Sequence, residues 1–337
     1  MSHITQRPAS LCAFLPQCFR LENNARTSEA VNVEYNFTQV LDGIPGAEGP
    51  VFNNRSYFYM VAPEVEKNGK YAGQVLKVDL EKKQTSVFLE PSVNGYGGIP
   101  AGMQFGKDGT FRVSDMRLGI LKVTPDGNMT QVCRQDSEGR PMQGCNDCIF
   151  DYQGSLWVTA PAEEIAPAPF TKSKEEPFGS VYCMLTSGQV VRVDTGIRFP
   201  NGIAVLHTDD GRPKKLIVAE TPTKLLWSYD IVEPGKVANK TIWGRLSGDH
   251  EGGADGLDFD ADNNLLAAHR GGGFIEVFSS QGGQPQKRIK CPFMRTSNLH
   301  FKPKSNTVYV TEHDNHGLWE FKWENQGKPQ KCEMLFD

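Results

Sequence analysis

A single local pattern occurs six times in this chain of 337 residues. Each occurrence has a short apolar strand, a polar turn and a second strand, as in CIFDYQGSLWVTA and NLHFKPKSNTVYVTE. The anchor residues of the repeats are, in chain order, Phe52, Phe105, Phe150, Val205, Phe259 and Phe301. Because the intervals suit a four-stranded blade, the repeats predict an all-β, six-bladed β-propeller with a central tunnel. The alternative, a pair of β-sandwiches, does not need one local pattern six times.

Length and composition fit a large globular unit, with 38% hydrophobic residues and a mean hydropathy of -0.44. We expect residues 35–337 to form the propeller as the catalytic domain, and residues 1–34 to be a disordered N-terminal extension. The early stretch SLCAFLPQCFRL is broken by Pro16, which fits neither a signal peptide nor a membrane helix. We expect a cytoplasmic protein, although the arginines of residues 1–34 leave organelle targeting open.

The charge pattern narrows the range of partners. The formal net charge is -4, the isoelectric point is near 6.0, and no run of Lys and Arg is interleaved with aromatic residues. We therefore expect no nucleic-acid partner. No apolar run approaches the ~18 residues that would span a bilayer, so we expect no membrane partner. The expected partner is a small-molecule substrate, bound by a monomer.

The motif GCNDC contains a Cys-x-x-Cys pair, Cys145 and Cys148, among eight cysteines in the chain. A structural zinc site would need a second close pair of Cys or His ligands, and none has that spacing. A thioredoxin-like role would need a βαβ context, whereas the surrounding segments have strand character. The pattern therefore favours buried free thiols.

In a propeller, equivalent positions of successive blades form a ring around the axis. The position four residues before each anchor holds Glu48, Ala101, Asn146, Asn201, Asp255 and Ser297. Four of these six side chains offer carboxylate or carboxamide oxygen, which favours Ca²⁺ over zinc as a bound ion. The alternative is that the Asn and Asp residues only make turns that enter strands. Asp147 is a candidate for a carboxylate that orients the ligands from behind.

A second set of polar groups lies next to the anchors. Asp258 and His300 each precede their anchor by one residue, with the Leu299 backbone alongside. Because strand alternation would point this position away from the first ring, we expect the first ring to lie on loops that enter the strands. A deeper cation and a buried Asp–His pair explain the second set equally well. His313 is either a residue of the same funnel or a structural hydrogen-bonding group.

Longer motifs add a resemblance to a known family. The segments IPGAEGPVF, VNGYGGIPAG, DSEGRPMQGCNDC, FPNGIAV, HEGGADGLDFD and NLHFKP resemble calcium-dependent phosphotriesterases of the senescence-marker/gluconolactonase superfamily, from about residue 35 to the C-terminus. The resemblance implies two calcium ions. It implies that the catalytic ion is bound by Glu48, Asn146, Asn201 and Asp255. It also implies a structural ion bound by Asp258, the Leu299 carbonyl and His300, with His313 in a supporting role at the mouth.

The resemblance further implies hydrolysis of organophosphorus compounds at the P–F bond, as in substrates like diisopropyl fluorophosphate. Asp255 would either attack phosphorus or act as the base for a water molecule, and the sequence does not choose between these roles. A lactonase using the same calcium site and a non-enzymatic, calcium-stabilised binding propeller remain as alternatives.

The sequence departs from the family pattern near the expected pocket. His269-Arg270-Gly271 stands where the family has Asn-Trp-Gly, and Lys172 and Lys174 stand where Arg and Met are expected. A cationic Arg270 would favour an anionic substrate or weaken binding of apolar phosphofluoridates, unless these residues form only a solvated rim. The candidates for the pocket wall are Ile99, Phe170, Lys172, Lys174, Phe199 and Arg270.

Overall fold

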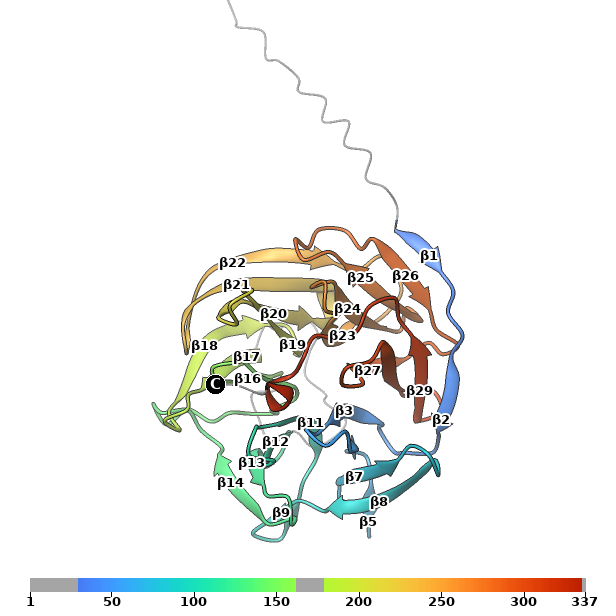
Figure 1. The fold of residues 1–337 in the computed structure, drawn as a ribbon. Coiled ribbons are helices and arrows are strands. Elements are labelled where there is room, and N and C mark those ends of the chain that lie inside the picture. Colours follow the sequence, from blue (N-terminus) through green and yellow to red (C-terminus); the bar gives the residue numbers. More distant parts are fainter. Residues whose placement is uncertain (1–29, 162–178, 335–337) are drawn as a thin grey trace, which may run out of the picture.

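The computed structural model describes residues 30–161 and 179–334. Within these ranges the chain is almost entirely β-structure, with two short 3₁₀ helices, η1 (Thr221–Thr223) and η2 (Lys331–Glu333). Six sheets radiate from a common axis, as Figure 1 shows. The prediction of an all-β, six-bladed propeller is therefore confirmed.

The first three blades are four-stranded antiparallel sheets, with their strands ordered from the axis outward. Blade 1 contains β3 (Glu48–Phe52), β4 (Phe58–Ala62), β7 (Gln74–Asp79) and β8 (Gln84–Leu89). Blade 2 contains β11 (Pro100–Phe105), β12 (Phe111–Asp115), β13 (Gly119–Val123) and β14 (Met129–Cys133). Blade 3 contains β15 (Cys148–Phe150), β16 (Leu156–Ala160), β17 (Gly179–Met184) and β18 (Val190–Ile197).

The last three blades follow the same plan, and the N-terminal segment adds one strand to blade 5 and one to blade 6. Blade 4 contains β19 (Pro200–His207), β20 (Pro213–Glu220), β21 (Leu225–Glu233) and β22 (Lys236–Arg245). Blade 5 contains β23 (Gly253–Phe259), β24 (Leu265–Arg270), β25 (Phe274–Phe278), β26 (Lys287–Lys290) and β1 (Val31–Val33). Blade 6 contains β27 (Thr296–Phe301), β28 (Thr307–Glu312), β29 (Gly317–Lys322) and β2 (Thr38–Leu41). Two small hairpins, β5 (Glu66–Lys67) with β6 (Lys70–Tyr71) and β9 (Ser92–Val93) with β10 (Tyr96–Gly97), extend from loops.

The N-terminal segment closes the propeller. Strand β2 pairs antiparallel with β29, so blade 6 combines the two ends of the propeller sequence in one sheet. Strand β1 pairs in parallel with β26 and covers the outer edge of blade 5. The folded structure thus begins before the domain boundary expected at residue 35. A three-residue edge strand buries little apolar surface, so it leaves a weak signal in the sequence.

The repeated polar turn has a common side-chain contact. Asn53, Asp151 and Asp260 each directly follow an anchor, and the Oδ1 atom of each accepts a hydrogen bond from the backbone N–H four residues later, at 2.8 to 3.0 Å. The second carboxylate oxygen of Asp151 and of Asp260 accepts a bond from a buried tryptophan, Trp157 at 2.9 Å and Trp323 at 3.0 Å. Each of these aspartates therefore fixes a turn and satisfies a polar atom of the core at once.

The core lies between neighbouring blades, because each inner sheet face packs on the next blade. Val51 and Tyr59 of blade 1, for example, pack with Met103 and Phe111 of blade 2. The six inner strands β3, β11, β15, β19, β23 and β27 contact one another in a closed ring around the axis. This ring places the ends of six strands around one narrow space.

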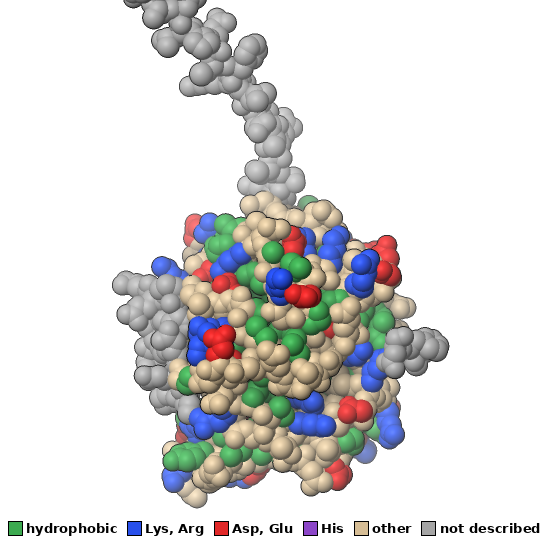
Figure 2. Space-filling view, turned by 90° about the vertical axis from the view of Figure 1, so that its left-hand side faces the viewer, with side chains coloured by type: hydrophobic (Ala, Val, Ile, Leu, Met, Phe, Trp, Pro, Cys, Tyr) green, Lys and Arg blue, Asp and Glu red, His purple; other side chains and the backbone are tan. Residues whose placement is uncertain are grey.

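The outer surface is mixed in character. On the face that Figure 2 shows, basic and acidic side chains are interspersed, with scattered hydrophobic ones between them. Among the described residues, no helix has the length and apolar composition needed to cross a membrane.

Candidate metal centre and active site

The predicted ring positions lie within the inner strands, not on loops. Five of the positions belong to inner strands, namely Glu48 in β3, Ala101 in β11, Asn201 in β19, Asp255 in β23 and Ser297 in β27. The sixth, Asn146, lies two residues before β15. The expectation that this ring lies on entry loops was therefore wrong for five blades. The reason is that each of those strands contains a register shift next to the ring position. The shifts fall between Glu48 and Val51, between Pro100 and Gly102, between Pro200 and Ile203, between Ala254 and Leu257, and between Thr296 and Leu299. A bulge breaks strict alternation and re-aims a side chain without ending the strand.

The carboxylate and carboxamide members of the ring are close to one another. The side chain of Asn201 lies close enough to the Asp255 carboxylate to act against the rise in its pKa, and Glu48 lies within electrostatic range of Asp255. The backbone N–H of Asn146 donates to the Thr159 carbonyl at 2.8 Å, and the Thr159 hydroxyl donates to the Asn201 carbonyl at 2.7 Å. The structure thus brings together the residues that sequence reasoning placed on one ring.

Hydroxyl groups join the ring from blade to blade. Besides Thr159, the Thr221 hydroxyl accepts from Asn201 Nδ2 at 3.2 Å and donates to the Ala254 carbonyl at 2.7 Å. The Ser297 hydroxyl donates to the Ala47 carbonyl at 2.9 Å, directly before Glu48. These bonds fix the backbone on either side of the oxygen ligands, as is required of a preorganised site.

Burial makes the two ring carboxylates costly to ionise in the absence of a cation. Burial, followed by the charge of Asp255, raises the pKa of Glu48 well above its ordinary value. Burial likewise raises the pKa of Asp255 to about 7, against the opposing effect of the Arg270 guanidinium. Two buried carboxylates that repel each other, with carboxamide oxygens beside them, form a donor set that fits a hard divalent cation.

Asp147 lies between this ring and the deeper polar groups. Its Oδ1 accepts from Cys148 N at 2.8 Å, and its Oδ2 accepts from Ile203 N at 3.2 Å, so the carboxylate ties blade 3 to blade 4. Burial raises the pKa of Asp147 to about 7, and its charge acts on Glu48, Asp255 and Asp258. It therefore faces both candidate ion positions.

The deeper set surrounds a small cavity on the axis. This cavity has a volume of about 20 Å³, and its walls include Asp147, Asp258, Leu299 and His300. A space of this size holds one water-sized particle. Asp258 Oδ2 lies 3.2 Å from His300 Nδ1, so the predicted Asp–His pair is present. His300 Nε2 is nevertheless buried without a hydrogen-bond partner in the described chain, which leaves a ligand atom free for an ion.

His313 reaches the first ring, as one of its two predicted roles required. It follows β28, and its Nε2 lies 3.7 Å from Glu48 Oε1, too far for a hydrogen bond. Burial, with the charge of Arg270 next in importance, lowers the pKa of His313 to about 3. The imidazole is therefore neutral near pH 7 and adds no positive charge to the site.

Three of the expected pocket residues are placed near the ring. Ile99 is buried beside Ala101, two residues before that ring position. Phe199 stands two residues before Asn201 with a positive φ of 50°, a conformation that non-glycine residues rarely adopt outside constrained sites. Arg270 ends β24, opposite Gly253 of β23. Phe170, Lys172 and Lys174 lie outside the described residues.

The two thiols of the GCNDC motif belong to a hydrophobic core cluster. Cys145 and Cys148 are free and buried in the core between blades 2 and 3. Burial raises the pKa of Cys148 to about 12 and that of Cys145 well above its ordinary value. Such thiols are poor nucleophiles and poor metal ligands. Asn146 and Asp147 therefore remain the candidate functional residues of the motif.

Sequence reasoning missed Asn298, whose side chain lies close enough to the Glu48 carboxylate to act against the rise in its pKa. The signal lies in the position after each ring residue, which holds Gly49, Gly102, Asp147, Gly202, Gly256 and Asn298. Glycine is needed there because the next blade packs against it. A Cβ on Gly102 would lie 2.8 Å from the Asn146 carbonyl, and one on Gly202 would collide with the Asp255 carbonyl. The two positions that are not glycine are the two that extend polar side chains to the axis.

Gln330 was also missed, because it lies outside the repeats. This residue precedes η2, and its Nε2 donates to Asp258 Oδ1 at 3.2 Å. No group of three or more His, Cys, Asp or Glu with metal-ligand geometry occurs in residues 30–161 and 179–334. The candidate sites instead combine carboxylates with carboxamides or with a single histidine.

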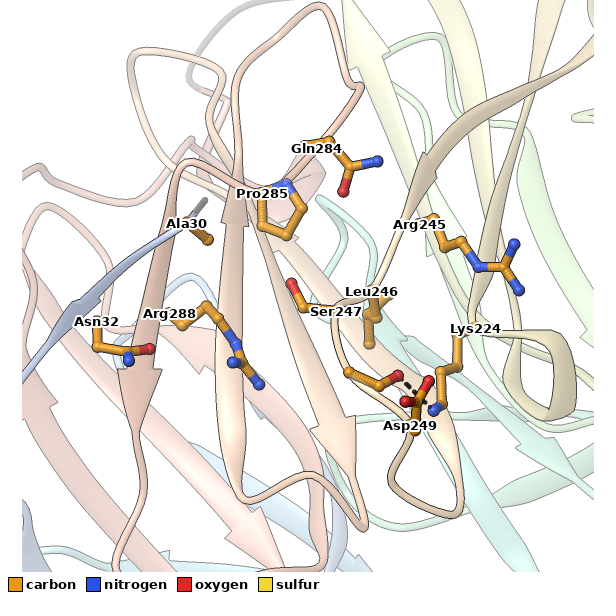
Figure 3. A pocket seen from close by; sticks show the side chains of 11 residues that line it. Ala30, Asn32, Lys224, Arg245, Leu246, Ser247, Asp249, Gln284, Pro285 and Arg288 are labelled. Carbon is orange, nitrogen blue, oxygen red and sulfur yellow. Dashed lines mark hydrogen bonds between the residues drawn. The ribbon is translucent and has the colours of Figure 1, made fainter. Parts of the chain in front are cut away.

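A larger cavity of about 690 Å³ lies away from the axis, between blades 4 and 5 (Figure 3). Lys224, Arg245 and Arg288 line it, and the Lys224 ammonium donates to the Gly248 carbonyl at 2.8 Å. No predicted site residue contributes to its walls. The candidate active site is therefore the axial ring and not this outer cavity.

Comparison with known proteins finds relatives that match most of the chain. The chain is 59% identical over 304 residues to diisopropyl-fluorophosphatase of Loligo vulgaris, covering 90% of this chain and 97% of that protein. It is 24% identical over 293 residues to gluconolactonase of Zymomonas mobilis, covering 82% of this chain and 78% of that protein. The fold matches the solved structure of the calcium-binding protein regucalcin from Agrobacterium tumefaciens with a TM-score of 0.71 at 17% identity, over 91% and 100% of the two chains.

The family model described as SMP-30/Gluconolactonase/LRE-like region matches residues 47–314. The matched segment includes every ring position and both deeper side chains, so it spans the axial site as well as the blades that form it. The chain belongs to the SMP-30/gluconolactonase/LRE-like family.

Proposed function

We propose that this protein is a hydrolase of organophosphorus compounds that cleaves P–F and related bonds at the mouth of the propeller. The carrying observation is the pair of neighbouring ring carboxylates, the largely buried Glu48 and the buried Asp255, with the Asn201 carboxamide beside Asp255. The 59% identity to a diisopropyl-fluorophosphatase supports this substrate class.

We propose Ca²⁺ as the ion, with two ions per chain. The mouth ion is assigned to Glu48, Asn146, Asn201 and Asp255, an all-oxygen set that calcium prefers. The deeper ion is assigned to Asp258, the Leu299 carbonyl and His300, which line the axial cavity. The orphaned Nε2 of His300 supports the deeper assignment.

A bound calcium ion would polarise the phosphoryl oxygen and stabilise the charge that develops there. Asp255 is the residue that acts on the substrate, either by forming an O–P bond as fluoride leaves or by removing a proton from an attacking water molecule. In the first case a water molecule then attacks the carboxyl carbon of the acyl phosphate, which releases the phosphate product with an oxygen from Asp255 and restores the carboxylate with an oxygen from water. Asn201 lies beside Asp255, and its Nδ2 is held by the Thr221 hydroxyl.

Lactone hydrolysis is the second candidate, because the same ring would polarise a carboxylic ester. The family match and the gluconolactonase relative favour it. Parallel assays with diisopropyl fluorophosphate and simple lactones would separate the two activities. Calcium binding without turnover of either would favour a binding propeller.

We also propose that the protein acts as a monomer in the cytoplasm. Closure of blade 6 by β2 completes the propeller within one chain. The free state of the six described cysteines supports a reducing compartment.

Removal of calcium is expected to abolish activity and to lower the melting temperature. An ion that binds only the folded chain stabilises it by about 2.7 kcal/mol at 100 times its Kd, and this contribution disappears on chelation. Fluoride release from diisopropyl fluorophosphate and thermal unfolding are measured with and without a strong chelator, then after calcium is restored. If chelation changes neither quantity, calcium is not the cofactor.

Replacement of Asn146 by alanine is expected to be far more harmful than removal of both motif thiols. Loss of a direct ligand should exceed the ~10–100-fold effect of an outer-sphere change, because the ion loses an oxygen. The matched control is Cys145→Ala with Cys148→Ala, which alters only the packing of buried thiols. The measurement is kcat/KM at saturating calcium. An active Asn146→Ala enzyme beside an inactive thiol variant would reverse the assignment.

Asp255→Asn and Glu48→Gln are expected to differ in activity although each removes one charge from the same ring. Asn keeps an oxygen ligand but can neither attack phosphorus nor accept a proton, so turnover should fall by a further ~10²-fold or more. Both variants are assayed at calcium concentrations shown to saturate them. Equal losses of turnover in the two variants would show that Asp255 acts only as a charge-balancing ligand.

Single turnover in ¹⁸O-labelled water then separates the two roles of Asp255. Label that first enters the Asp255 carboxylate supports direct attack on phosphorus. Label that goes directly into the phosphate product supports the base role.

A further inference from the structure

Arg270 ends β24 at the mouth of the propeller, next to the proposed active site. Its backbone pairs with Gly253 of β23, two residues before Asp255, and forms a bridge to Arg295 in the segment that enters blade 6. The residue therefore stands between blades 5 and 6, on the side where His313 approaches Glu48. Its charge acts on both Asp255 and His313.

Corresponding strand ends in three other blades carry carboxylates that accept hydrogen bonds from the backbone. Asp115 of β12 accepts from Leu118 N at 2.8 Å, Glu220 of β20 from Arg198 N at 2.7 Å, and Glu312 of β28 from Asn315 N at 2.9 Å. These carboxylates fix nearby turns and loops. Blade 5 has His269 at this position, with its Nδ1 2.7 Å from Glu276 Oε1, and Arg270 follows it at the end of the strand.

The guanidinium of Arg270 has no hydrogen bond or ion pair within residues 30–161 and 179–334, apart from its longer-range effect on Asp255 and His313. The neighbouring Arg295 differs, because its Nε lies 2.6 Å from Asp314 Oδ1. Both arginines act on His313, but only Arg295 is held by a carboxylate of its own. Arg270 is thus available to a ligand and Arg295 is not.

Charge balance shows what that ligand would be. Glu48 and Asp255 together would neutralise one divalent cation. The Arg270 guanidinium is then a surplus positive charge beside a metal ion, and two cations at short range repel unless an anion lies between them. A guanidinium is well suited to bind phosphoryl oxygens through two parallel hydrogen bonds.

We infer that Arg270 selects substrates with a negatively charged oxygen on phosphorus, that is, monoanionic phosphate or phosphonate esters. This inference rests on the proposed function and narrows its substrate class. The anionic oxygen lies toward Arg270, while the ester that is cleaved lies at Asp255. Neutral phosphofluoridates are then accepted substrates that leave Arg270 unused.

The test compares Arg270→Gln with the matched control Arg295→Gln. The substrates are ethyl 4-nitrophenyl phosphate, which is anionic, and diethyl 4-nitrophenyl phosphate, which is neutral and has the same leaving group. Arg270→Gln should lower kcat/KM for the anionic ester by ~10-fold or more, the effect of one charge-assisted hydrogen bond, and should change kcat/KM for the neutral ester by a clearly smaller factor. Arg295→Gln should leave kcat/KM for both esters unchanged.

Two binding measurements make the test independent of turnover. By calorimetry, Arg270→Gln should weaken binding of diisopropyl phosphate by ~10-fold. It should also tighten calcium binding several-fold, since a nearby positive charge is removed, whereas Arg295→Gln should do neither.

The possible outcomes distinguish failure of the role assigned to Arg270 from failure of the proposed function. Equal effects of Arg270→Gln on both esters, or unchanged anion and calcium binding, would overturn the role of Arg270. Failure of the calcium-loaded native protein to hydrolyse any organophosphorus ester would instead sink the proposed function, and the binding measurements would still decide whether Arg270 holds an anion.

Discussion

Four buried carboxylates face the axis of this propeller, and the described chain pairs none of them with a lysine or arginine. Glu48, Asp147 and Asp255 have pKa values raised first by burial, and each lies in the field of at least one other axial carboxylate. Asp258 faces His300 below them. Such an arrangement would favour opening of the blades unless cations balanced it. Two divalent ions would cancel these four charges, which is the physical basis for the calcium proposal.

The fold opposes this repulsion because hydrogen bonds between blades hold the backbone on either side of the ring residues. Hydroxyls of Thr159, Thr221 and Ser297 connect the carbonyls beside the ligands across blade boundaries. Glycines such as Gly102 and Gly202 let adjacent blades approach so closely that a side chain would collide with the next carbonyl. The ligands are therefore held in place before any ion arrives, which lowers the free-energy cost of ordering them on binding.

The sequence predicted the architecture and the ring because both follow from a repeat. Once the anchors were aligned, a fixed offset led to Glu48, Asn146, Asn201 and Asp255. Bulges were not predicted, since a register shift depends on how two strands pair and leaves no local signature. Asn298 was missed although it occupies the same offset as Asp147, and Gln330 was missed because the segment after the last repeat has no counterpart. Strand β1 was missed because an edge strand of three residues has little periodicity.

Calcium stoichiometry tests the central claim most directly, because it measures the ions and not the chemistry that depends on them. Equilibrium dialysis of the chelated protein against calcium should give two ions per native chain. The double variant Glu48→Gln with Asp255→Asn should keep its fold, lose the mouth ion and retain the deeper one. A native protein that binds no calcium, or a double variant that still binds both ions with native affinity, would contradict the assignment of the axial carboxylates as calcium ligands.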